Sequence, residues 1–106
     1  MHGKNSAEIE REILRPLWKV HILHHAGEAP ILGHWMLEEL RGHGYRVSPG
    51  TLYPMLARMT RLRWLKAVHG KRGDRKTVHY RLTATGRAAL NEVRARLREL
   101  GTEVRP

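Results

Sequence analysis

The 106-residue chain contains no cysteine. Disulfide bonds and thiolate metal sites are therefore excluded, and an intracellular, cytoplasmic protein is the expectation. Long apolar runs are also missing. No stretch approaches the roughly 18 apolar residues that a membrane-spanning helix needs, and residues 1–14 lack the apolar core of a signal peptide. We therefore expect no membrane as a partner.

Side chains suited to catalysis are scarce. The only serines are Ser6 and Ser48, and the single aspartate, Asp74, falls in a predicted loop, so a Ser-His-Asp set is implausible. The sequence has no phosphate-binding Walker loop, no HExxH zinc motif and no dinucleotide fingerprint. We therefore expect a protein that is not an enzyme and that needs no cofactor.

Positive charge is abundant and unevenly placed within the net charge of +10. Residues 1–40 carry 4 Lys or Arg against 6 Glu, whereas residues 58–81 carry 9 Lys or Arg against Asp74 alone. Such segregation favours an electrostatic face for a polyanion, because each neutralised phosphate releases condensed counterions. The alternative is a solvated basic surface without a dedicated partner.

The spacing of apolar residues predicts two helices in the first half of the chain. From Leu14 into "PLWKVHILHHA", the apolar residues Leu14, Trp18 and Ile22 recur every four residues, and Pro16 fits only a first turn or a bend in one N-terminal helical region. The segment 31–44, "ILGHWMLEELRGHG", predicts a second helix with a buried stripe, ended by its glycines. That stripe consists of Leu32, Met36 and Leu40, with Leu37 beside it.

A third helix is predicted to start at "SPGTLYPML". Ser48 is a good N-cap residue, Pro49 suits the first helical position, and Leu52, Leu56 and Met59 recur at core spacing. Two helices joined by a short turn form a helix-turn-helix. The N-terminus of the helix that follows the turn, here the one at Ser48, offers unpaired N–H groups and the positive end of its dipole to a phosphate, and a glycine there permits close approach.

Residues 65–82 change to a two-residue period around the loop "GKRGDRK", which predicts an antiparallel hairpin. Thr83 is then a candidate N-cap of a last helix with an apolar seam at Leu90, Val93, Leu97 and Leu100. These four side chains have no obvious partner inside one small subunit, so we expect them to form the interface of a homodimer.

The predicted architecture is mainly α with a small β-hairpin, that is, an α+β winged helix-turn-helix with a C-terminal dimerisation helix. Residues 1–82 would form the DNA-binding domain with its N-terminal helix, and residues 83–106 the dimerisation helix and tail. Such a module places the start of its recognition helix in the major groove of double-stranded DNA and touches the flanking backbone with its wing.

Three segments resemble the PadR family of transcriptional regulators. "SPGTLYPMLARM" resembles the family's recognition helix, "APILGHWMLEEL" its second helix, and "HYRLTATGRAAL" its second wing strand running into the last helix. The similarity spans residues 17–90 and departs from the family pattern at His34 and His79. It implies a winged helix whose last helix packs with the N-terminal helix of a second subunit, and a dimer that usually represses transcription.

The resemblance and the charge pattern together give the expected DNA-binding residues. At the recognition helix these are Ser48, Gly50, Thr51, Tyr53, Pro54 and Arg58, and at the wing tip they are Lys71, Arg72, Arg75 and Lys76.

Two alternatives stay open beside a simple regulator. One is a sensor whose effector is a metal or a small molecule: His21 and His25 lie one helical turn apart and could share a metal, although no third ligand is fixed by the sequence. Trp18 and Trp35 could line an effector cavity between subunits, against core or dimer packing. The other alternative is a protein-interaction module whose basic face is unrelated to DNA.

Overall fold

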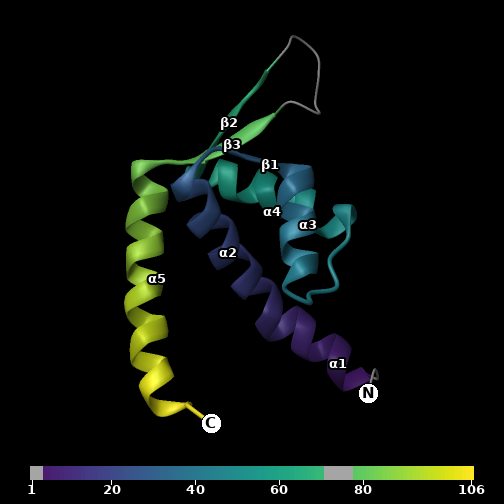
Figure 1. The fold of residues 1–106 in the computed structure, drawn as a ribbon, viewed down its shortest axis with the longest axis vertical. Coiled ribbons are helices and arrows are strands. Elements are labelled where there is room, and N and C mark those ends of the chain that lie inside the picture. The colour runs from purple at the N-terminus through teal and green to yellow at the C-terminus, as the bar shows by residue number, and fades with distance from the viewer. Residues whose placement is uncertain (1–3, 71–77) are drawn as a thin grey trace.

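The structure, a computed structural model, describes residues 4–70 and 78–106. In chain order its elements are α1 (Lys4–Ile9), the π-helical segment η1 (Glu10–Leu14), α2 (Arg15–Glu28), β1 (Ile31–Leu32), α3 (Gly33–Gly42), α4 (Pro49–Arg61), β2 (Leu65–Val68), β3 (His79–Leu82) and α5 (Ala84–Glu103) (Figure 1).

The expected single N-terminal helical region is confirmed, and its irregularity is a π turn. α1, η1 and α2 follow one another without a break, with Pro16 in the first turn of α2. A proline ring collides with the carbonyl four residues earlier in a regular helix. Here the N–H of Arg15 donates to the carbonyl of Glu10, five residues back, so the wider turn lies just before the proline.

The core lies between α2, α3 and α4, and it confirms most of the predicted stripes. Leu52, Leu56 and Met59 of α4 are completely buried, as are Met36 and Leu40 of α3. Among the residues that the structure describes, fifteen buried apolar side chains form one cluster, which extends to Leu65 of β2 and Leu90 of α5. α4, the predicted third helix, therefore has a fixed inner face, which leaves its outer face free for another partner.

α3, the predicted second helix, starts later than its apolar pattern predicted. Ile31 and Leu32 form β1, which pairs with β3 through Ile31 opposite Tyr80 and Leu32 opposite His79, so the expected hairpin is part of a three-stranded antiparallel sheet. Leu32 is the extended residue that precedes α3 and is not part of its stripe. β3 offers an edge to which this short segment hydrogen-bonds, and that distant partner outweighs the local helical spacing.

The start of α5 is joined to the turn between α4 and β2. The backbone N–H of Thr83 donates to the carbonyl of Trp64 at 3.0 Å, and its hydroxyl donates to the carbonyl of Arg63. The same hydroxyl accepts from the N–H of Gly86 at 2.9 Å, which confirms Thr83 as the N-cap. These bonds hold the end of the recognition helix, the base of the wing and the last helix together.

One expectation about the last helix is wrong. Leu90 is 1% exposed and belongs to the subunit core, where α5 packs on α2. The first half of α5 therefore has its partner within the chain. Farther along, Leu97 and Leu100 are 40% and 48% exposed, and α5 runs on toward the C-terminus beyond the packed core (Figure 1). Among the described residues, no helix has the length and apolarity to cross a membrane.

Candidate nucleic-acid interface

The start of α4 is exposed, and its first turn carries no acidic residue. Ser48 stands at the N-cap position, as predicted, with Pro49 first in the helix. Its hydroxyl does not cap the helix: Ser48 Oγ lies 3.3 Å from Thr51 Oγ1, and both belong to the outer surface of the turn. Ser48, Pro49 and Gly50 are all exposed. The N–H groups of Thr51 and Leu52 donate to the carbonyl of Ser48 at 3.0 Å, and Pro49 has no N–H. The helix start therefore presents two hydroxyls and the backbone of Gly50, which suits an anionic or hydrogen-bonding partner.

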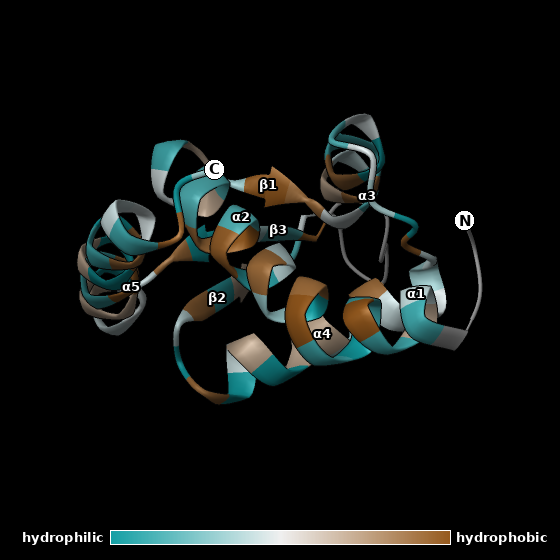
Figure 2. Cartoon of the chain, turned by 90° about the horizontal axis from the view of Figure 1, so that it is seen from below, coloured by the Kyte–Doolittle hydropathy of each residue, from teal (hydrophilic) through white to brown (hydrophobic). Residues whose placement is uncertain are grey.

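The outer face of α4 is polar and continuous with this first turn. Figure 2 shows the hydrophobic residues of α4 toward the rest of the molecule and the hydrophilic ones on its outer side. Tyr53, Pro54 and Arg58 are exposed on that side. Pro54 has no N–H, so the carbonyl of Gly50 lacks its usual helical donor. The face thus carries an acceptor as well as donors within one turn.

Tyr53 combines exposure with a fixed ring position. The residue is 43% exposed, and a Cβ on Gly33 would stand 2.6 Å from its Cε1. The ring therefore lies against the backbone at the start of α3, where only a glycine leaves room. Burial and, secondarily, Tyr53 raise the pKa of Tyr80 on β3. No sequence pattern indicates the contact between Gly33 and Tyr53.

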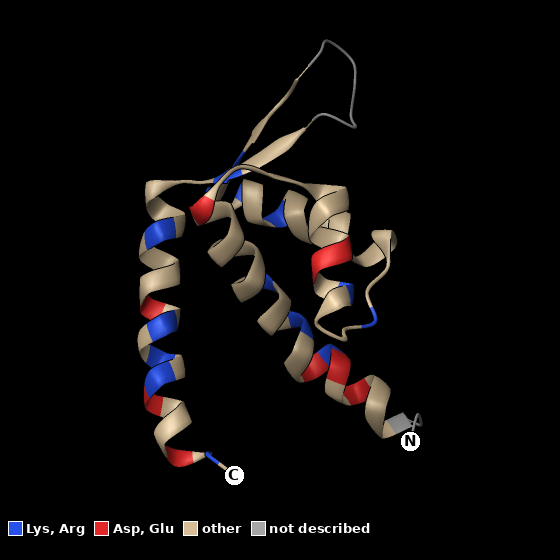
Figure 3. Ribbon diagram, in the orientation of Figure 1, with Lys and Arg blue, Asp and Glu red and all other residues tan. Residues whose placement is uncertain are grey.

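Two cations of the sheet stand directly opposite each other. Lys66 of β2 and Arg81 of β3 are register partners, so their exposed side chains share one face. Like charges in this position repel each other. Figure 3 shows no acidic residue on α4 or on the strands. Within residues 4–70 and 78–106, neither of these cations forms an ion pair, and the same holds for Arg58, Arg61 and Arg63.

The predicted wing lies next to the recognition helix. α4 packs against β2, and β2 and β3 lead away from the body of the subunit (Figure 1). The expected wing-tip residues Lys71, Arg72, Arg75 and Lys76 lie outside the described residues. The described part of the cationic surface consists of Arg58, Arg61, Arg63, Lys66 and Arg81, and we call it the α4–sheet surface.

The two tryptophans considered for an effector cavity lie in different surroundings. Trp18 is 1% exposed and packs in the core, beside an open hollow of about 800 Å³ between the N-terminal helices and the start of α4. Trp35 is 45% exposed and lines a separate hollow of about 350 Å³ with His25 and His79. Within one subunit, the two rings therefore do not line a common pocket.

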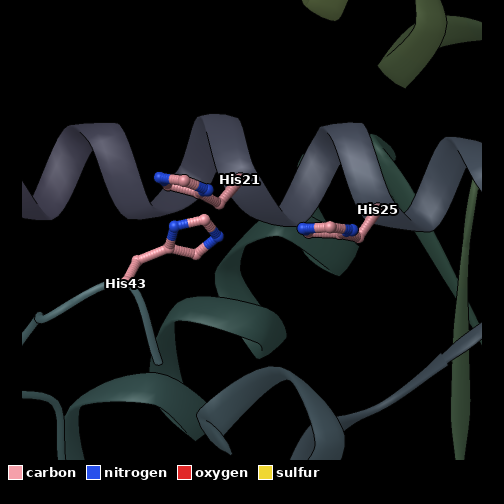
Figure 4. A group of neighbouring side chains, drawn as sticks. All are labelled: His21, His25 and His43. Atoms are coloured by element: carbon pink, nitrogen blue, oxygen red, sulfur yellow. The ribbon is translucent and has the colours of Figure 1, made fainter. Parts of the chain in front are cut away.

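The histidines of α2 gain a neighbour that the sequence could not assign. His21 and His25 lie on the side of α2 that faces the turn after α3, and His43 of that turn reaches toward them (Figure 4). The rings of His21 and His43 are 4.6 Å apart between centroids. Only the packing of α3 against α2 brings His43 to the pair.

Comparison with known proteins agrees with this arrangement. Residues 22–92 match the model of the transcriptional regulator PadR-like family. A transcriptional regulator of Mycobacterium tuberculosis, Rv3488, is 47% identical over 94 residues, which cover 89% of this chain and 88% of that protein.

Two crystal structures show the same fold. The PadR-like transcriptional regulator of Bacillus cereus gives a TM-score of 0.75 at 23% identity over 92% of each chain. The PadR family regulator of Eggerthella lenta gives 0.72 at 24% identity over 96% of this chain and 94% of that one. Family match and fold together identify this chain as a member of the PadR-like family, whose proteins are winged helix transcriptional regulators and not enzymes.

Proposed function

We propose that the protein is a sequence-specific repressor that binds double-stranded DNA as a homodimer. The observation that carries the proposal is the α4–sheet surface, where exposed cations gather without an acidic partner among the described residues. Lys66 and Arg81 repel each other in the free protein, and a phosphate between or beside them would relieve that repulsion. Binding to chromosomal DNA would place the protein in the cytoplasm.

In the proposed complex, the start of α4 enters the major groove. Ser48, Thr51 and Tyr53 would meet base edges or sugars, while Gly50 and Pro54 let the backbone come close. Arg58 and the cations of the sheet would contact phosphates on either side. Because the inner face of α4 is fixed by the core, the helix would dock as a rigid element.

The proposed dimer interface uses the exposed second half of α5 and the N-terminal helices. Leu97 and Leu100 are exposed on α5, and Ile9 and Ile13 are 40% and 59% exposed on α1 and η1. A two-fold axis would bring the α5 of one subunit onto the N-terminal helices of the other, so that each apolar strip covers its counterpart. Two recognition helices about 34 Å apart would then read successive major grooves.

The proposal is tested by selecting fragments of the source genome that the purified protein retains. Affinity for a selected fragment and for a random duplex is then measured by fluorescence anisotropy over a range of salt concentrations. We expect the selected site to bind at least about a thousandfold more tightly, and the logarithm of both affinities to fall linearly with log salt. A response that is flat in salt would instead support a protein-interaction module.

A second candidate function is a sensor whose DNA binding responds to a metal. The cluster of His21, His25 and His43 favours it, because these residues join α2 to the turn that precedes α4.

A further inference from the structure

Three imidazoles from distant parts of the chain meet between α2 and the end of α3. His21 and His25 lie one turn apart on α2, and His43 follows α3 as its C-cap residue. One nitrogen from each ring lies within 4.8 Å of the other two. Figure 4 shows the three side chains converging on one place from the two segments. Such a set has the residue types and the proximity of a transition-metal site.

A carboxylate completes the group. Glu39 Oε2 lies 3.8 Å from His25 Nε2 and 3.7 Å from His43 Nε2, so it stands between two of the three rings. The Glu39 side chain is 27% exposed and that of His25 is 18% exposed, which makes this side of the group partly shielded from water. Three imidazoles and one carboxylate match the tetrahedral coordination that zinc prefers.

His21 has a hydrogen-bonding neighbour outside the group of four. The hydroxyl of Tyr45 lies 3.4 Å from His21 Nε2. A partner at one ring nitrogen orients the imidazole and leaves the other nitrogen as the ligand atom.

We propose that His21, His25, His43 and Glu39 bind one divalent transition-metal ion of the zinc type, which bridges α2 and the turn between α3 and α4. Zinc–nitrogen bonds are about 2.0–2.1 Å long, so the ligand atoms must draw closer than they stand here. His43 is able to move, because its side chain is 48% exposed and it lies beyond the last residue of α3.

A second histidine group shares one member with this site and offers a built-in comparison. His24, His25 and Glu28 also approach one another within 4.8 Å, all on the last turns of α2. Glu28 is 63% exposed, and the group supplies only three ligands from one helix. The proposed site instead has four ligands from two segments, and closing a longer loop of chain stabilises the folded state more.

The bridge would act on the recognition helix, a step that rests on the proposed function. Tyr45 contacts the rings of His21 and Trp18, and the guanidinium of Arg41 donates from Nε to the carbonyl of Val47 at 3.1 Å. Residues 44–48 thus link His43 to Pro49, the first residue of α4. A metal that ties His43 to α2 would fix how α4 is presented relative to α2 and α5.

The binding test uses the purified full chain and zinc in competition with a coloured chelator. We expect one equivalent of zinc per subunit. His43→Gln or Glu39→Gln should each weaken zinc binding by about 100-fold, because the loss of a mere hydrogen-bond partner of a metal ligand already costs about 10–100-fold. His34→Gln is the matched control, since His34 is exposed on α3 outside the cluster, and it should change the affinity less than twofold. Cobalt as a probe should give the intense visible absorption of a four-coordinate ion, and His43→Gln should abolish it.

Several results would overturn the site. They are an absence of zinc binding, an unchanged affinity in His43→Gln, or an equal loss in His24→Gln and Glu28→Gln, which would place the metal on α2 alone. Thermal unfolding of the metal-free variants checks that each is folded; His43 and Glu39 are outside the buried core, so their melting temperatures should stay near that of the parent.

The regulatory step has its own readout. Anisotropy with a duplex is recorded for the parent and for His43→Gln, with zinc and with a chelator. We expect zinc to change the DNA affinity of the parent at least fivefold and that of the variant not at all. If zinc binds and DNA affinity is unchanged, the coupling is wrong and the site stands. If no duplex binds in any condition, the proposed function fails, while the zinc measurements remain valid.

Discussion

A Cβ placed on Gly86 would stand 2.1 Å from the carbonyl oxygen of Trp64. The first turn of α5 therefore lies directly on the backbone of the turn between α4 and β2, where Arg63 has a positive φ of 65°. The "HYRLTATGRAAL" segment shows why threonine and glycine occur three residues apart: Thr83 bonds the turn and Gly86 leaves it room. This contact fixes how α4, the wing strands and α5 lie relative to one another.

Gly86→Ala should destabilise the fold, since a backbone carbonyl cannot yield as a side chain does. Overpacking of this kind costs about 1–3 kcal/mol or more, measured as a lower urea midpoint. Gly101→Ala is the matched control on the same helix: nothing lies within 4 Å of its Cβ, and alanine favours the helix by about 1 kcal/mol. Equal effects of the two substitutions would contradict the close contact.

Leu97→Glu should dissociate the proposed dimer. A carboxylate in an apolar interface is expected to cost at least about 2 kcal/mol, or roughly 30-fold in the dissociation constant measured by analytical ultracentrifugation. Ala95→Glu is the control, because Ala95 is exposed about 200° around the same helix. A monomeric parent protein would refute the dimer.

Leu90→Ala should instead lower the stability of the subunit by about 2–5 kcal/mol, because Leu90 is in the core.

Tyr53→Ala should reduce specificity more than general DNA affinity. If the ring meets base edges, its loss should cost about 1–3 kcal/mol on the selected site and little on a random duplex, as measured by anisotropy. Gly33→Ala should reproduce part of this effect, because its Cβ would displace the ring. Equal losses on both duplexes would mean that Tyr53 only positions the protein.

Lys66→Ala should weaken all DNA binding alike. One phosphate contact fewer should lower the slope of log affinity against log salt by about 1. Arg105→Ala removes an equal charge beyond the end of α5, far along the chain from the α4–sheet surface, and should leave the slope unchanged. A drop with Arg105→Ala as large as that with Lys66→Ala would show that only net charge matters.

Stability should fall in alkaline solution because of Tyr80. Its pKa in the folded chain is raised above the ordinary 10.0, first by burial and then by Tyr53, so the unfolded chain releases the proton first. The unfolded state then binds fewer protons than the native state, and the free energy of unfolding declines as the pH rises above about 10. Urea midpoints from about pH 9 to about pH 11 should fall less steeply in Tyr80→Phe. An identical pH dependence would contradict this assignment.

Local patterns predicted the elements, and distant partners account for what they missed. The inner face of α4 and the two wing strands followed from spacing alone, since each repeats a period within a few residues. Leu32 obeyed the helical spacing and yet became part of β1, because β3 lies beside it only after folding. The burial of Leu90 likewise depends on α2, nearly seventy residues earlier in the sequence.

The candidate site shows the same division. The start of α4 and its exposed residues were predicted from prolines, glycine and charge, whereas the support of Tyr53 by Gly33 and the approach of His43 to His21 were not. Both of these are contacts between elements, and no sequence period records them. Ser48 Oγ pairs with the hydroxyl of Thr51 and does not accept from a backbone N–H, and composition does not decide between these two neighbours.

The π turn at Glu10–Leu14 divides one helical rod into two parts with different rotational phase. An α-helix advances about 100° per residue, so the extra residue held in the wider turn rotates everything before it relative to α2. Ile9 thereby faces a direction that a uniform helix would not give it, while Trp18 keeps its place in the core. Deleting a single residue between 10 and 14 would restore a regular α-helical repeat there and rotate α1 to another direction relative to α2, with the fold of the remaining chain intact.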